Sequence, residues 1–184
     1  DRYVVRRPPL GHRLASAHDM GREHKIISGL QRSAVPVAPA LGFCDDEAVN
    51  DAPFYVMGFV DGHVLRDRAS TEAILDLAGR RRASESIVDT MAAIHRVDLA
   101  AAGLSELGRH EGYIARQLKR WYGQWQQQKT RELPAVDRVH AELSRRIPEQ
   151  GPATIVHGDY RLDNCMVGSD GHVMAVLDWE ICTL

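Results

Sequence analysis

The chain has 184 residues, which suffices for one ordinary domain or two small lobes, and its 44% hydrophobic content is typical of globular proteins. The net charge is −2, with 23 basic and 25 acidic residues mixed along the chain, so neither a nucleic-acid nor a membrane partner is expected. No apolar run approaches the length of about 20 residues that spans a bilayer, and the charged start differs from a signal peptide, which predicts a cytoplasmic protein.

The first third of the chain is predicted to form a small sheet with one helix. Tyr3 to Arg6 is rich in β-branched and aromatic residues and precedes two prolines, which predicts a strand. Apolar residues at spacings of three and four predict a helix over Ser16 to Leu30, capped by Ser16 or Asp19. Further strands are predicted at Ala40 to Cys44 and Phe54 to Phe59, on either side of a polar loop. Because the opening strand needs neighbours, we expect the sheet to be incomplete in this chain.

After Gly62 the pattern becomes mainly helical. Three helices are predicted, at Thr71 to Val97, Tyr113 to Lys129 and Ala135 to Ile147. Prolines and a glycine in 148–152 interrupt the pattern, and three short β runs follow at Ala153 to His157, Met166 to Val167 and Val173 to Leu177. We therefore expect a partial nucleotide-binding lobe over residues 1–60 and a helical lobe over residues 61–184, itself truncated.

Three polar residues near the end of the chain carry the strongest chemical signal. Asn164 follows Asp159 by five residues, and Asp178 comes fourteen residues later, beyond a predicted hairpin. Phosphoryl transfer requires a group that accepts the proton of the acceptor hydroxyl, and metal ions that neutralise charge on the phosphates. Asp159 is the candidate for the first role, and Asn164 and Asp178 are candidate magnesium ligands because that ion prefers oxygen donors. Singly, each would be read as a turn residue; together their spacing favours function.

The run from His157 to Asp159 with Asn164, followed by Leu177 to Trp179, resembles the catalytic loop and metal-binding segment of the aminoglycoside phosphotransferase family, relatives of the protein kinases. In protein kinases the loop reads His-Arg-Asp, with Asn five residues after the Asp, and the later Asp belongs to Asp-Phe-Gly. Here Gly158 replaces the Arg and Trp179 replaces the Phe. The front of the chain is similar to the branch that includes the phosphotransferase domains fused to acyl-CoA dehydrogenases.

The resemblance implies an α/β (α+β), two-lobed protein-kinase-like fold. It also implies ATP and Mg²⁺ as cofactors and a hydroxyl group of a small molecule as the acceptor. Arg6 and Glu23 match a basic residue that contacts the nucleotide phosphates and the glutamate that pairs with it, although the family usually has Lys. Phe59 and Val60 match the hinge, whose backbone hydrogen-bonds the adenine. A glycine-rich loop before Tyr3 and helices after Leu184 would complete the family pattern, so we expect this chain to be a fragment.

Several alternatives stay open at this point. Arg6 and Glu23 could form an inconsequential surface ion pair, and His157 is expected to be structural rather than reactive. The chain could be a catalytically silent, pseudokinase-type nucleotide-binding module, or a metal-dependent hydrolase that uses Asp159 and Asp178. The acceptor could be an aminoglycoside, a hydroxyacyl thioester, a sugar or an amino alcohol.

Overall fold

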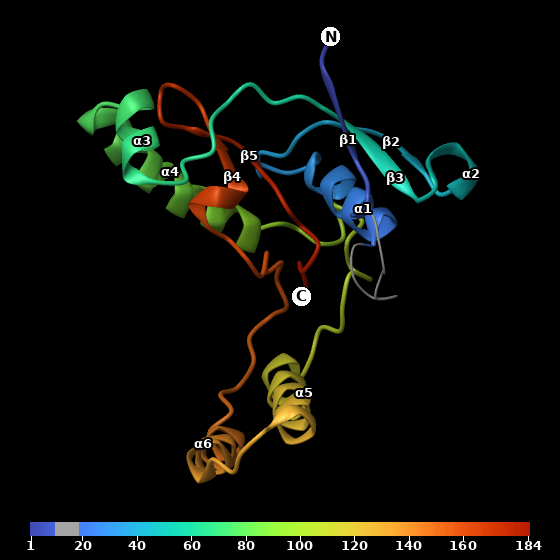
Figure 1. Ribbon diagram of the computed structural model, residues 1–184, viewed down its shortest axis with the longest axis vertical. Coiled ribbons are helices and arrows are strands. Elements are labelled where there is room, and N and C mark those ends of the chain that lie inside the picture. Colours follow the sequence, from blue (N-terminus) through green and yellow to red (C-terminus); the bar gives the residue numbers. More distant parts are fainter. Residues whose placement is uncertain (10–18) are drawn as a thin grey trace. The chain divides into compact units, whose positions relative to one another are not determined.

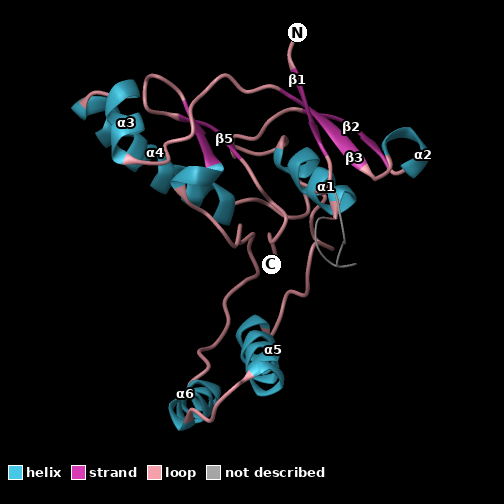
Figure 2. Cartoon of the chain, viewed as in Figure 1, coloured by secondary structure: helices cyan, strands magenta, loops and turns pink. Residues whose placement is uncertain are grey.

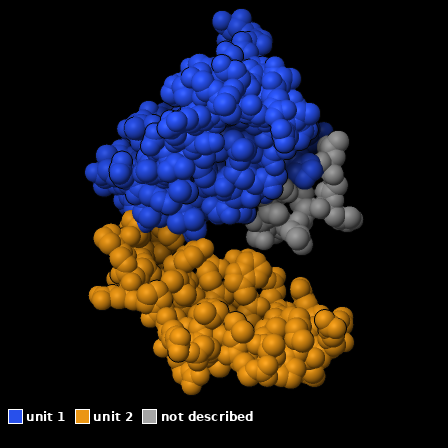
Figure 3. Space-filling model, turned by 90° about the vertical axis from the view of Figure 1, so that its left-hand side faces the viewer, with its two compact units in different colours: residues 1–107, 154–183 blue, residues 108–153, 184 orange. Residues whose placement is uncertain are grey.

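The computed structural model describes residues 1–9 and 19–184 (Figure 1). They form two compact units, one of residues 1–107 and 154–183 and one of residues 108–153 and 184 (Figure 3). The lobe boundary expected near residue 60 falls within the first unit and stays a prediction. Among the helices of the described residues, none combines the length and hydropathy that crossing a membrane requires.

A three-stranded antiparallel sheet opens the first unit (Figure 2). Its strands are β1 (Tyr3–Arg6), β2 (Ala40–Cys44) and β3 (Phe54–Gly58), in the order β1-β3-β2. The predicted strands are confirmed, and β3 ends one residue early. The register places Arg6 opposite Tyr55. This pairing puts a cation of one strand beside an aromatic residue of the next.

Helix α1 (Met20–Leu30) packs against β2 and β3. The Asp19 side chain accepts a hydrogen bond from the Arg22 N–H, which confirms one of the two predicted caps. The other, Ser16, lies outside the described residues. The polar loop between β2 and β3 contains one short helix, α2 (Glu47–Asn50).

The single helix predicted over Thr71 to Val97 is wrong, because the structure has α3 (Arg68–Ile74) and α4 (Leu77–His95). Leu75 is extended and buried between them, and Asp76 caps α4 by accepting a hydrogen bond from the Gly79 N–H at 2.6 Å. Burial of Leu75 and the new cap outweigh the helical periodicity that runs through the break.

A hairpin of β4 (Cys165–Val167) and β5 (Val173–Val176) packs on α4, and the Val173 N–H donates to the Ser86 hydroxyl. The Val176 N–H donates to the Pro36 carbonyl, which ties β5 to the segment after α1. The predicted strand at 153–157 is reduced to a single bridge, in which Val156 pairs with Thr183. These contacts connect the end of the chain to α4 and to the segment that follows α1.

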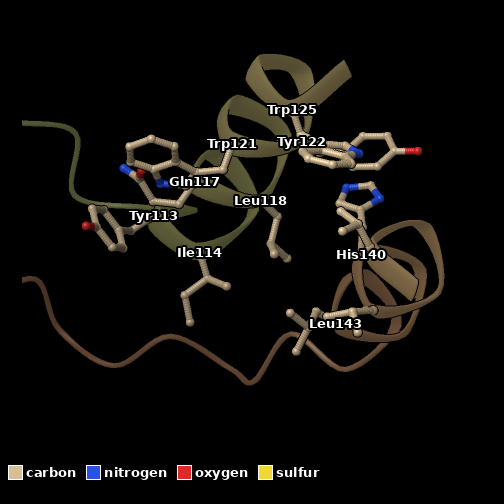
Figure 4. Close-up of a pocket in the computed structure, with 11 residues that line it drawn as sticks. Tyr113, Ile114, Gln117, Leu118, Trp121, Tyr122, Trp125, His140 and Leu143 are labelled. Atoms are coloured by element: carbon tan, nitrogen blue, oxygen red, sulfur yellow. The ribbon is translucent and has the colours of Figure 1, made fainter. Parts of the chain in front are cut away.

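The second unit contains two helices, α5 (Tyr113–Gln128) and α6 (Pro134–Arg145), close to the predicted ranges (Figure 4). Tyr122 stacks on His140 with ring centroids 3.8 Å apart, and its hydroxyl donates to Asp137. Neither helix has a fully buried residue, and Trp121 is 59% exposed. The aromatic residues of α5 therefore line an open groove and do not form a core.

Candidate functional site

The loop that contains Asp159 and Asn164 is closed by these two side chains. Asn164 Nδ2 donates to the Asp159 carbonyl at 2.8 Å and to Asp159 Oδ2 at 3.0 Å. A 3-10 turn over Leu162–Asn164 returns the amide to the start of the loop. Because Nδ2 is used by Asp159, the amide oxygen of Asn164 is the atom available to a cation. The five-residue spacing thus produces a direct contact between carboxylate and amide.

His157 connects this loop to the segment that carries Asp178. It is 2% exposed, and its Nδ1 accepts a hydrogen bond from the Asp159 N–H at 3.3 Å. The proton must then be on Nε2, which lies 2.9 Å from the Leu177 carbonyl and donates to it. Burial lowers the pKa of His157, because desolvation disfavours the imidazolium. A neutral, doubly hydrogen-bonded ring agrees with the structural role expected from the sequence.

Leu177 positions Asp178 from both sides of its backbone. Its carbonyl accepts from His157, and its N–H donates to the Asn164 carbonyl at 2.8 Å. Asp178 follows with φ of 61°, in the left-handed region that few residues other than glycine adopt. Such a conformation is found mostly where surrounding contacts enforce it, often at functional sites. The three polar residues predicted from the sequence are thus joined through His157 and Leu177.

Gly158 shows why the kinase-type arginine is absent. Its φ is 91°, and a Cβ atom there would lie 2.9 Å from both Cγ1 and the carbonyl oxygen of Ile181. Only glycine combines this backbone conformation with so close an approach. The residue before Asp159 is therefore determined by the packing of the loop on the chain that follows Asp178.

Arg6 bridges two carboxylates from different parts of the chain. Its Nε donates to Glu23 at 3.0 Å, and its Nη2 donates to Asp178 at 2.9 Å. Glu23 is 1% exposed and also accepts a hydrogen bond from the Trp179 N–H. Burial raises the pKa of Glu23, and the neighbouring guanidinium opposes that rise. The pair is buried at Glu23, so it differs from the exposed ion pair considered as an alternative.

A cavity of about 90 Å³ lies beside this bridge. It is lined by the three residues of the bridge, by two residues of β3, and by apolar residues of α1, β5 and the adjoining segments: Arg6, Glu23, Asp178, Tyr55, Met57, Ile27, Ala38, Val176 and Leu177. Its volume is below the several hundred Å³ typical of ligand pockets, so only part of a nucleotide would fit. Asp159 and Asn164 are outside its lining. The structure thus joins Arg6, Glu23 and Asp178 around one cavity, and Asp159 with Asn164 in the adjoining loop.

Phe59 and Val60 follow β3 and are not part of this cavity lining. The Phe59 N–H donates to the Arg2 carbonyl at 3.2 Å, and the Arg2 guanidinium lies 4.0 Å above its ring. Phe59 is therefore in contact with the residue before β1. The backbone donor of Phe59 is already used, whereas its carbonyl and the Val60 backbone are not involved in these contacts.

The residues fit a magnesium ion that is held largely by its nucleotide. Within the described ranges there is no group of three or more His, Cys, Asp or Glu residues that could hold a metal alone. Asn164 and Asp178 nevertheless supply one amide and one carboxylate oxygen donor. Mg²⁺ is commonly bound through one or two carboxylates together with substrate phosphates and water. This donor set suits that mode of binding.

Tyr55 contributes to the site but was not recognised in the sequence, and Trp179, which was identified there only as part of the motif, contributes through its burial. Tyr55 is buried next to Glu23, and burial raises the pKa of its hydroxyl. Trp179 is fully buried, and its indole donates to the Val176 carbonyl. The contacts of both residues with Glu23 join distant parts of the chain, so spacing along the sequence carries no signal for these contacts.

Known proteins resemble the chain along its whole length. The profile of the family described as "Phosphotransferase enzyme family" matches residues 1–184. Acyl-CoA dehydrogenase family member 10 of Mus musculus is 36% identical over 98% of this chain, and member 11 of Homo sapiens is 33% identical over 99%. The aligned region covers 17% and 23% of those two proteins. The chain therefore spans less than a quarter of these relatives.

Solved structures share the fold. A candidate aminoglycoside phosphotransferase from Ralstonia eutropha superposes with a TM-score of 0.83 at 36% identity, over 98% of this chain and 53% of that one. The ternary complex of APH(2'')-IIa with streptomycin and ATP superposes with a TM-score of 0.67 at 14% identity, over 98% of this chain and 60% of that one. The expected fold class is confirmed, and the chain belongs to the phosphotransferase enzyme family, with the protein-kinase-like α+β fold of the aminoglycoside phosphotransferases.

Proposed function

We propose that the chain forms part of an ATP-dependent phosphotransferase that moves the γ-phosphoryl group to a hydroxyl group of a small molecule. The main support is the hydrogen-bonded connection from Asp159 and Asn164 through His157 and Leu177 to Asp178. Such a connection holds a proton acceptor and two metal-ligand candidates in a fixed relation, which phosphoryl transfer requires.

In this proposal Asp159 is the catalytic residue. Its Oδ2 accepts a hydrogen bond from Asn164, which orients the carboxylate in the loop. Asp159 accepts the proton of the acceptor hydroxyl as the new bond forms between that oxygen and the γ-phosphorus, and the bond to the ADP oxygen breaks. His157 is neutral and buried, and it positions Asp159 without exchanging protons with the substrate.

The remaining residues bind the nucleotide. Asn164 and Asp178 would hold Mg²⁺, which when bound neutralises charge on the phosphate oxygens. Arg6 contacts the phosphates while Glu23 holds its Nε. The carbonyl of Phe59 and the backbone of Val60 contact the adenine, since the N–H of Phe59 is donated to Arg2.

Two pockets of the second unit do not suit a polycationic ligand. One of them is lined mainly by aromatic and aliphatic residues of α5 and α6 (Figure 4). The lining of the other includes Arg109, Arg116, Lys119 and Arg120. Neither pocket has a carboxylate in its lining, although carboxylates would be needed to pair with the amines of an aminoglycoside. Because the relatives include proteins named as acyl-CoA dehydrogenases, a hydroxyacyl thioester is the first acceptor to test, followed by sugars and amino alcohols.

The test uses the full-length protein with ATP, Mg²⁺ and each acceptor class, and it measures ADP and phosphorylated product by mass spectrometry. Asp159→Asn should lower the rate of product formation about 10²- to 10⁴-fold, the usual contribution of a general base, and leave nucleotide binding intact. Asp163→Asn is a matched control, because Asp163 lies in the same loop but pairs with Arg161. It should stay near the wild-type rate.

Each rival makes a different forecast. A silent module binds ATP but forms no product with any acceptor, and a hydrolase releases phosphate at the same rate without one. A wild-type rate in Asp159→Asn would refute the assignment of the base.

A further inference from the structure

Asp178, the proposed metal ligand, already has a cation beside it. Arg6 Nη2 donates to Asp178 Oδ1 at 2.9 Å, across 172 positions of the chain. A metal ion that bound this carboxylate would lie within a few ångströms of the guanidinium. Two cations so close repel strongly wherever water is partly excluded. Pairing of the Asp178 carboxylate with Arg6 therefore opposes the binding of a metal ion to the same carboxylate.

The two halves of the Arg6 bridge differ in how firmly they are held. Glu23 is 1% exposed and is also fixed by the Trp179 N–H, so its bond to Arg6 Nε is protected from water. Asp178 is 36% exposed, and its pairing with Nη2 competes with solvent. The hydrogen bond from Arg6 Nη2 to Asp178 is thus the one that another acceptor can replace, while Arg6 Nε remains bonded to Glu23.

Arginine suits such an exchange because its donors are distributed over three nitrogens. With Nε bound to Glu23, Nη1 and Nη2 still carry four further N–H groups. Guanidinium pairs readily with phosphate oxygens, often through two parallel hydrogen bonds. A nucleotide phosphate beside Arg6 would accept the hydrogen bonds that Asp178 gives up.

We propose that Arg6 controls metal binding at Asp178. Arg6 pairs with the Asp178 carboxylate until a nucleotide phosphate accepts the hydrogen bonds of its Nη groups, so that a divalent ion binds Asp178 only together with the nucleotide. This inference rests on the proposed function and adds a positioning and regulatory role for Arg6. Metal alone would leave the Arg6 charge next to a second cation, and phosphate removes that obstacle. Binding of metal and of nucleotide should therefore be strongly cooperative.

The experiment measures binding of Mn²⁺, as a spectroscopic substitute for Mg²⁺, to the full-length protein by electron paramagnetic resonance. Titrations are done with Mn²⁺ alone and with Mn²⁺ plus a non-hydrolysable ATP analogue. The informative variant is Arg6→Met with Glu23→Gln, because removing Arg6 alone would leave Glu23 buried without its partner. The glutamine side chain of this variant retains an oxygen that can accept from the Trp179 N–H. Glu23→Gln alone is the matched control, since it keeps Arg6.

The wild type and Glu23→Gln should show no saturable Mn²⁺ binding at Asp178 without the analogue. The double variant should show saturable binding of Mn²⁺ alone, with an affinity at least about tenfold above the weakest affinity that the titration can detect, a difference of about 1.4 kcal/mol. Adding Asp178→Asn to the double variant should abolish this gain, which locates the metal. Equal Mn²⁺ affinity in the wild type and the double variant would overturn the proposal.

Should the double variant fail to fold, titration of the wild type with Mn²⁺ alone still tests the proposed role of Arg6. Saturable Mn²⁺ binding to the wild type without nucleotide, lost in Asp178→Asn, would overturn the proposed control of metal binding by Arg6. A different result bears on the proposed function: if Asp178→Asn leaves binding of Mn²⁺ with the analogue unchanged, the metal assignment fails whatever Arg6 does.

Discussion

Replacing Gly158 by alanine tests whether the loop geometry depends on the residue before Asp159. The backbone φ of 91° is unfavourable for any L side chain, which costs about 1–2 kcal/mol. The new Cβ would also lie 2.9 Å from the backbone oxygen of Ile181, and overpacking of this kind costs typically about 1–3 kcal/mol. Together these effects predict a loss of about 3 kcal/mol.

The assay is hydrogen exchange on the full-length protein, followed in peptides that cover residues 154–167, together with thermal unfolding. A loss of about 3 kcal/mol lowers the unfolding temperature of a unit of this size by about 6–12 °C and speeds exchange in those peptides. Gly151→Ala is the control, because no atom lies within 4 Å of its added Cβ, and it should change neither. Unchanged exchange in Gly158→Ala would refute the steric argument.

Two further predictions concern stability. Because burial lowers the pKa of His157, its neutral form contributes stability fully above its ordinary pKa of about 6.5, and this contribution is lost as the pH falls below that value. His157→Gln should therefore flatten the decline of unfolding temperature between about pH 7 and 5, and an unchanged slope would contradict this. Asp76→Ala removes the α4 cap and should cost about 1 kcal/mol, measured as faster exchange in the first turn of α4; Asp89→Ala, within the same helix, serves as the control.

Local patterns determined much of the fold. Strands β1 and β2 have the predicted boundaries, and α5 and α6 are within two residues of theirs. Their propensity and periodicity are properties of neighbouring residues. The same holds for Asp159 and Asn164, whose contact forms within one short loop. The break at Leu75 has two causes: the Asp76 cap, which is local, and the burial of the Leu75 side chain, which depends on the tertiary structure and could not be predicted.

The sequence by itself determined the residue types at the candidate site and their spacing, and through the resemblance the family. Only the tertiary structure decided that Arg6 contacts Asp178, that Glu23, the other partner of Arg6, is buried, and that Tyr55 lines the same cavity. The physical reason is distance along the chain. Contacts between residues 172 positions apart form only when β1, α1 and the segment after β5 pack together, and no local propensity encodes that packing.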